Sequence, residues 1–187
     1  NMNRTEAANF EYRTDENNHV WIVSLNGKKT KDASRRMTRA LSDTQDLLCI
    51  PETINGRTVV GIDPQAFRNE DKIHAVFLPD TVTEIGSQAF ENCSSLTTVQ
   101  ASSALTSIGS RAFAETSALS SFTFPQTLTA VGEESFTGSG IVTANLPQSV
   151  TYLGAGAFAD CTKLVYAQVP AAIQAIRERT FRNCTEL

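Results

Sequence analysis

The sequence has few of the residues that build catalytic and metal sites. Its 187 residues include two histidines, one tryptophan and four cysteines, and only 7% of the residues are aromatic. Neither His19 nor His74 lies in a His or Cys cluster with zinc spacing, and no Gly-x-Ser-x-Gly motif or phosphate-binding glycine loop is present. The sequence therefore predicts no enzyme, no metal and no cofactor.

Basic charge and long apolar runs are also scarce. There are 16 Lys and Arg against 20 Asp and Glu, a net charge of -4, which argues against a nucleic-acid partner. No stretch approaches the roughly 18 to 20 apolar residues of a membrane span. Because the chain begins at Asn1 rather than Met, we expect a mature or trimmed product. At 41% hydrophobic residues the chain has enough apolar content to fold.

What the sequence does have is a repeat of about 23 residues. A phenylalanine recurs at intervals of 23, 23, 23, 22 and 23 residues. Aliphatic residues lie five and eight positions before each phenylalanine. Coils that each bury their apolar face against the next coil produce this kind of periodicity, so we expect a solenoid with a continuous core. The phenylalanines are Phe67, Phe90, Phe113, Phe136, Phe158 and Phe181.

Each unit contains the pattern of one short strand and one turn. Apolar residues alternate, as in Val76 and Leu78, and a proline such as Pro79 closes the strand because proline cannot donate to a ladder. A glycine then permits a turn, and the segment 87–90 is long enough for about one helical turn. We therefore predict an α/β repeat, with short parallel strands on one face and turns or helical turns on the other.

The two ends of the chain differ from the repeat. Residues 1–45 do not repeat, and Phe10–Tyr12 and Val20–Val23 flank a turn-rich stretch, which predicts a β-hairpin cap with Trp21 in its core. Residues 46–187 hold about six repeats. Leu187 is the first residue of a further unit, and we expect the chain to be truncated there, with other domains of a longer parent protein beyond it.

One segment of the N-terminal region is strongly basic. It has a net charge of plus five within residues 28–39. An anionic glycan or phospholipid surface would suit it, but a solvated basic loop is the favoured interpretation because no aromatic residue is interleaved with the charges. The basic residues are Lys28, Lys29, Lys31, Arg35, Arg36 and Arg39.

A row of outward-facing positions on the strands is the candidate binding surface. Because side chains alternate along a strand, the residues on either side of Val76 or Val99 should point outward. This row contains no formal charge. Phe77 and Tyr166 stand out, and Phe77 is either a partner anchor or a residue packed under the cap. The row comprises Leu47, Cys49, Ala75, Phe77, Thr98, Gln100, Ser121, Thr123, Thr143, Asn145, Tyr166 and Gln168.

Three cysteines, Cys93, Cys161 and Cys184, lie three residues after a repeated phenylalanine. Cys93 is about three coil spacings from Cys161, which is too far for a disulfide. Cys161 and Cys184 lie in adjacent coils, at a distance that a disulfide can span. Buried free thiols are nevertheless the favoured interpretation.

The repeat resembles a known family. The run Leu-x-x-Val-x-Leu-Pro-x-x-Val-x-x-Ile-Gly-x-x-Ala-Phe-x-x-Cys is similar to BspA-like leucine-rich repeats, and residues 73–93 match it almost throughout. The departures are Asp63 and Arg177 in place of Gly, Ser102 in place of Pro, and Thr116 and Ser139 in place of Cys.

The resemblance, over residues 46–187, implies a right-handed leucine-rich-repeat solenoid in an extracellular or cell-surface bacterial protein. It implies a non-enzymatic adhesion or host-interaction module that recognises a host or cell-surface protein or glycan. The alternative is a purely structural spacer within a larger surface protein.

Overall fold

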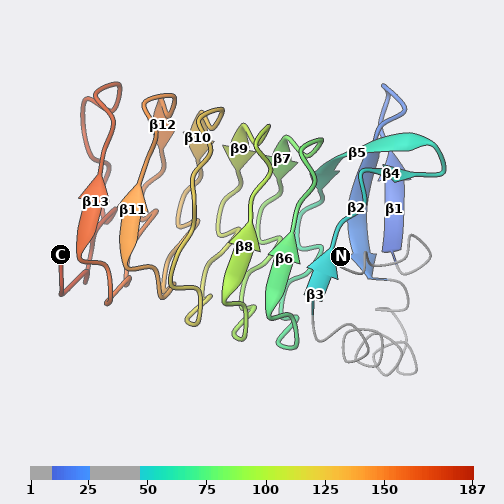
Figure 1. Ribbon diagram of the computed structural model, residues 1–187. Coiled ribbons are helices and arrows are strands. Elements are labelled where there is room, and N and C mark those ends of the chain that lie inside the picture. The colour runs from blue at the N-terminus through green and yellow to red at the C-terminus, as the bar shows by residue number, and fades with distance from the viewer. Residues whose placement is uncertain (1–9, 26–46) are drawn as a thin grey trace.

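The computed structural model describes residues 10–25 and 47–187, which form a parallel β-solenoid (Figure 1). Its coils lie side by side along one axis, with the N-terminal hairpin at one end and the last coil at the other. The predicted fold class is confirmed. Two ladders of short parallel strands run along the solenoid, whereas the sequence predicted strands on one face only.

The first ladder forms what we call the strand face. It is split into a three-stranded and a two-stranded parallel sheet, and residues 121–124 between them form no strand. Two large rings, Phe122 and Phe124, point inward at this interruption and pack against the Phe136 ring. The strands are β3 (Leu47–Cys49), β6 (Ala75–Phe77), β8 (Thr98–Gln100), β11 (Thr143–Asn145) and β13 (Tyr166–Gln168).

The second ladder runs along the residues five positions before each of the first five phenylalanines. The stacked aliphatic side chains at these positions are buried, and glycine N–H groups continue the pairing, as where the Gly86 N–H donates to Ile62 O at 2.8 Å. The remaining segments are turns, and the described residues contain no helix. The strands are β5 (Arg57–Ile62), β7 (Glu84–Ile85), β9 (Ser107–Ile108), β10 (Ala130–Val131) and β12 (Tyr152–Leu153).

The predicted N-terminal hairpin is present and joins the second ladder. Strands β1 (Phe10–Thr14) and β2 (Val20–Leu25) pair antiparallel, β2 pairs in parallel with β5, and β4 (Thr53–Ile54) pairs antiparallel with β5. The Trp21 ring lies against Gly61, where an added Cβ would come within 2.3 Å of it. The Arg13 guanidinium lies over the same ring and pairs with Asp63 at 2.8 Å. Trp21 therefore helps to join the hairpin to the first coil.

The six recurring phenylalanines form the centre of the core. Successive ring centroids are 5.3 to 5.9 Å apart with nearly parallel planes. The first five rings are fully buried, and Phe181 in the last coil is partly buried. The core is thus one column of stacked rings flanked by aliphatic ladders, as the repeat predicted.

A column of glycines lets the coils approach closely. Asp63 in the first coil and Arg177 in the sixth take the place of this glycine. A Cβ at Gly154 would lie 2.3 Å from the backbone N of Glu133, so only glycine fits where one coil stacks on the previous one. Asp63 occupies this position in the first coil and faces the hairpin, where its N–H donates to Ile22 O at 2.8 Å. The column comprises Gly86, Gly109, Gly132 and Gly154.

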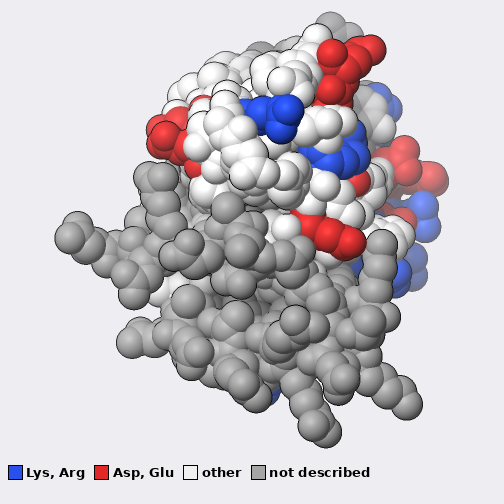
Figure 2. Space-filling model, turned by 90° about the vertical axis from the view of Figure 1, so that its right-hand side faces the viewer, with Lys and Arg blue, Asp and Glu red and all other residues white. Residues whose placement is uncertain are grey.

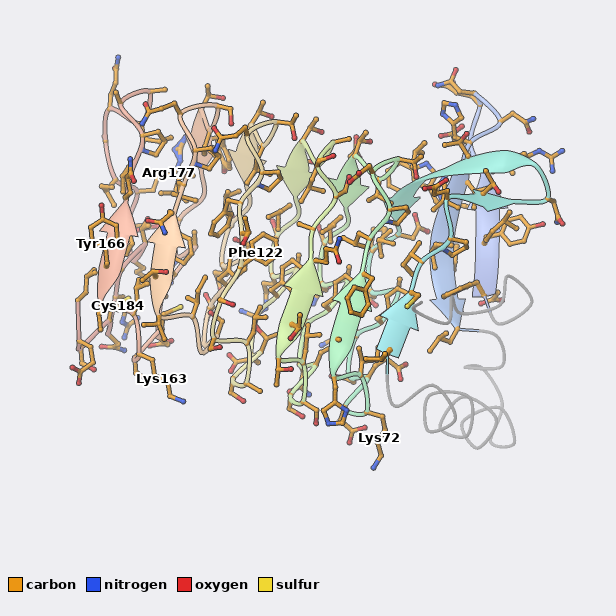
Figure 3. The ribbon with its side chains drawn as sticks, in the orientation of Figure 1. Lys72, Phe122, Lys163, Tyr166, Arg177 and Cys184 are labelled. Atoms are coloured by element: carbon orange, nitrogen blue, oxygen red, sulfur yellow. The ribbon has the colours of Figure 1, made fainter. Side chains whose placement is uncertain are left out.

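Arg177 ends the second ladder at β12. Its side chain Nε donates to Leu153 O at 3.2 Å, in the place that the glycine N–H takes in earlier coils, and its guanidinium lies 4.7 Å from the Tyr152 ring centroid (Figure 3). The neighbouring Ile176 is 49% exposed, whereas the residues at its position in earlier coils are buried. Arg177, which stands where the repeat usually has glycine, therefore replaces the backbone hydrogen bond of the ladder by a side-chain hydrogen bond.

Candidate binding surface

The strand face presents a row of uncharged polar side chains to solvent. In β8, Val99 points into the core, whereas its neighbours on both sides point outward, and the same alternation holds in β11. The row is exposed from β8 to the last coil. Its exposed members are Thr98, Gln100, Ser121, Thr123, Thr143, Asn145, Tyr166 and Gln168.

The parallel register places related side chains next to one another. In the pair β11 and β13, Thr143 lies opposite Tyr166, and Asn145 lies opposite Gln168. In the pair β6 and β8, Phe77 lies opposite Gln100. Two amide side chains therefore lie on neighbouring strands beside an exposed tyrosine, where they can donate and accept hydrogen bonds.

The N-terminal part of this row differs from the expectation. Cys49 and Ala75 are 3% and 7% exposed, so they are buried rather than outward and open to solvent. Ala75 has a short side chain on the central strand of three, between Leu47 and Thr98, and Cys49 lies opposite the large Phe77 ring. Leu47 and Phe77 are themselves partly buried.

Exposed apolar residues gather at the C-terminal end of the strand face. Tyr166 and Val165 are each 51% exposed, and Val142 is 37% exposed. The N–H of Val165 donates to Val142 O at 2.8 Å, so the two valines occupy adjacent coils. Sequence reasoning missed both valines. The available signal was the change from polar residues at this position in earlier coils, such as Thr97, to valine in the last two.

The basic residues of the segment 28–39 lie outside the described residues. On the side of the molecule where the hairpin lies, described basic and acidic side chains are interspersed (Figure 2). The described part of this side therefore shows no patch of a single sign.

The turn side of the solenoid contains a network of ion pairs around Glu91. This carboxylate accepts hydrogen bonds from Arg68 at 3.0 Å, Arg111 at 2.8 Å and Gln88 at 3.2 Å. Burial alone would raise the pKa of Glu91, but the hydrogen bonds from Arg111 and Gln88 and the charges of both arginines outweigh it, and this pKa is lowered. Glu91 therefore stays ionised between the coils that flank it.

The cysteines three residues after phenylalanine form a column of hydrogen bonds to the previous coil. The thiols of Cys93, Cys161 and Cys184 donate to the carbonyl oxygens of Phe67, Phe136 and Phe158, at 3.2, 3.0 and 3.1 Å. None of the four cysteines forms a disulfide in the structure. Burial, the largest effect, raises the pKa of Cys161 to about 11 and also raises that of Cys184.

We expect the two C-terminal thiols to differ in reactivity. Cys161 is buried, while Cys184 in the last coil is partly exposed, and only the thiolate reacts with alkylating reagents. In the native protein at pH 8, Cys184 should therefore react with iodoacetamide at least about tenfold faster than Cys161. Mass spectrometry of timed digests measures both rates, with the denatured chain as the control in which the rates converge. Equal native rates, or a linked Cys161–Cys184 peptide, would contradict this.

The described part of the chain has neither a metal-binding cluster nor a membrane-spanning helix. Residues 10–25 and 47–187 contain no group of three or more His, Cys, Asp or Glu side chains arranged to hold a metal ion. Within the same ranges, no helix has the length and apolar character needed to cross a bilayer.

Comparison with solved structures finds close relatives of the fold. A leucine-rich repeat protein of T. pallidum (TpLRR) is 27% identical with a TM-score of 0.88, and the match covers 99% of this chain and 80% of that chain. A leucine-rich repeat protein of Bacteroides ovatus is 28% identical with a TM-score of 0.83, covering 96% of this chain but only 44% of its own. A leucine-rich cell surface protein of Faecalibacterium prausnitzii, 22% identical, shares the fold with a TM-score of 0.50 over 85% of this chain and 52% of its own.

Among curated proteins none matches the sequence. The BspA type leucine-rich repeat region matches residues 60–187 in six copies, which agrees with the six phenylalanines of the repeat. The match covers about two thirds of the chain, so the chain belongs to the BspA-type leucine-rich repeat family.

Proposed function

We propose that this chain is a non-catalytic binding module of a bacterial cell-surface or extracellular protein, and that it recognises a host or cell-surface protein or glycan through the strand face. One observation carries the proposal. The C-terminal half of the strand face presents a tyrosine that is 51% exposed beside two amides in register, in a row with no charged side chain. Exposed aromatic residues dominate the energetics of interfaces, and amides supply directional hydrogen bonds.

The comparisons support the location of the proposed module. The F. prausnitzii relative is named a cell surface protein, and the chain spans less than half of the B. ovatus relative. We therefore propose that the module acts within a longer surface protein whose other domains complete its function. A purely structural spacer remains the second candidate, because a row of serine and threonine also serves to keep a sheet face solvated.

Substitutions on the two ladders distinguish a binding module from a spacer. Tyr166→Ser and the double variant Asn145→Ala, Gln168→Ala change the strand face, while Tyr152→Ser changes a tyrosine that is 36% exposed on the second ladder. Attachment of each protein to immobilised host matrix proteins and to a glycan array is measured, and denaturation curves verify the fold. We expect the strand-face variants to lose at least about tenfold in affinity and Tyr152→Ser to bind like the parent. A parent protein that binds neither surface would favour the spacer.

A further inference from the structure

Two columns of side chains run along the turn side of the solenoid. One column lies two residues before each repeated phenylalanine, and every residue in it has a positive φ. It comprises Gln65, Gln88, Arg111, Glu134, Gly156 and Arg179. The other column lies one residue after each phenylalanine. It comprises Arg68, Glu91, Ala114, Thr137, Ala159 and Arg182.

The second coil shows how these columns hold a carboxylate. Glu91 is 6% exposed and is bound by Arg68 from the first coil and Arg111 from the third coil. Arg111 also donates to Glu134 Oε2 at 2.6 Å. Each of these two guanidiniums therefore meets a carboxylate that an adjacent coil supplies, with the short geometry of charge-assisted hydrogen bonds.

The fifth coil has no carboxylate at its two column positions, which are Gly156 and Ala159. A hollow of about 150 Å³ lies beside these two small residues. Glu134 and Thr137 of the fourth coil line one side, and Arg179 and Arg182 of the sixth coil line the other. The hollow is thus a gap in both columns. Arg179, in the same column as Arg111, and Arg182, in the same column as Arg68, border it.

The guanidiniums beside the hollow lack the partners that the earlier ones have. The acid paired with Arg179 is its chain neighbour Glu178, at 3.8 Å between two exposed side chains, and among the described residues Arg182 has no ion pair. The acids nearby are engaged, since Glu134 pairs with Arg111 and Asp160 accepts a hydrogen bond from Asn183 Nδ2 at 2.7 Å. The hollow therefore offers guanidinium donors without a short ion pair, and a space for an acceptor.

We propose that this hollow binds a carboxylate, which Arg179 and Arg182 hold from the sixth coil as Arg111 of the third coil holds the side chain of Glu91. A planar carboxylate matches the fork of a guanidinium. Glu134 and Asp160 line the same hollow, and their negative charges disfavour a doubly charged anion such as phosphate. The ligand class is therefore a small monoanionic carboxylate, carried either by a uronic-acid sugar or by an acidic peptide side chain. The site is separate from the strand face.

A titration of the whole chain at fixed ionic strength tests the proposal. Backbone amide resonances are followed by NMR while glucuronate, N-acetylaspartate amide or inorganic phosphate is added. We expect saturable shifts centred on Gly156 and Ala159 with the two carboxylates, and binding of phosphate at least about tenfold weaker. Tighter binding of glucuronate assigns the ligand to acidic glycans, and tighter binding of the aspartate derivative assigns it to acidic peptides. Equal binding of phosphate, or no saturable shift with either carboxylate, would overturn the assignment.

Matched variants separate the hollow from general charge effects. Arg179→Gln with Arg182→Gln should weaken carboxylate binding at least about tenfold. Lys72→Gln with Lys163→Gln removes the same charge at two residues that do not line the hollow and that lie at the opposite edge of the coils from Arg177 (Figure 3), and it should leave carboxylate binding unchanged. Equal losses in the two double variants would overturn the proposal.

A third variant fills the hollow from within. Ala159→Glu places a carboxylate at the position that Glu91 holds in the second coil. We expect it to pair with the two arginines, to abolish glucuronate binding and to leave the melting temperature at or above that of the parent. A folded Ala159→Glu protein that binds glucuronate as the parent does would contradict the assignment.

Discussion

Replacing Phe113 by alanine is expected to unfold the chain or to bring it close to unfolding. Phe113 is fully buried, its ring stacks on Phe90 and Phe136 with centroids 5.3 Å away, and Phe122 packs against it at 5.2 Å. Removing such a ring costs about 3 to 5 kcal/mol, a large share of the roughly 5 to 15 kcal/mol that stabilises a domain. Because each coil contacts only its neighbours, a defect in the third coil also uncouples the two ends.

Phe181→Ala is the matched control for this variant. The Phe181 ring is partly buried in the last coil and stacks on Phe158 at 5.9 Å. We expect roughly half the loss or less, because fewer contacts are removed. Urea denaturation followed by circular dichroism measures both variants. A Phe113→Ala curve within the error of the parent, or no different from that of Phe181→Ala, would refute the stacked-ring core.

Gly109→Ala is expected to have the second largest effect. An added Cβ would lie 2.5 Å from the backbone N of Ser87 and 2.7 Å from the backbone C of Gly86. Backbone atoms cannot rotate away as a flexible side chain does, so two coils must separate and the hydrogen bond from Gly109 N–H to Ile85 O, 2.8 Å long, is strained. We expect a loss of about 3 kcal/mol from a substitution that adds one methyl group.

The neighbouring Ser110→Ala controls for the change to alanine itself. Ser110 is exposed, and a surface substitution of this kind should alter stability by no more than about 0.5 kcal/mol. Urea midpoints at equal m-values compare the two variants with the parent. If Gly109→Ala proved as stable as Ser110→Ala, the coils would not be in the close backbone contact described above.

The architecture could be predicted because the repeat makes one local pattern recur in every coil. Phe90 and Phe136 occupy the same position in the adjacent repeats as Phe113, so if one is buried all three are expected to be buried. One repeat therefore indicates the whole core. The hairpin was also predictable, since Val20 and Ile22 alternate with less buried neighbours as a half-buried strand requires. The second ladder was not expected, because two-residue strands such as β9 and β10 are too short to show alternation.

The candidate binding surface could be predicted only in part. Alternation correctly placed the exposed members of the row from Thr98 to Gln168, but it could not show that Ala75 and Cys49 are buried. The hollow beside Arg179 was missed because it lies beside two small residues, Gly156 and Ala159, that carry no functional group. The interpretation of the segment 28–39 as a solvated basic loop rather than a site for an anionic partner stays a prediction.

The sequence by itself determined the period, the column of rings and the family, because burial of one residue type at regular spacing is a local requirement that each coil repeats. Only the tertiary structure decided that the backbone pairing of the second ladder stops at β12 and that a hollow lies beside the fifth coil. The Arg177 side chain takes over a hydrogen bond from the backbone at the end of one ladder, and the fifth coil leaves two guanidiniums facing a hollow. Both features depend on which side chains of neighbouring coils meet across the stack, and that depends on distances between residues more than twenty positions apart.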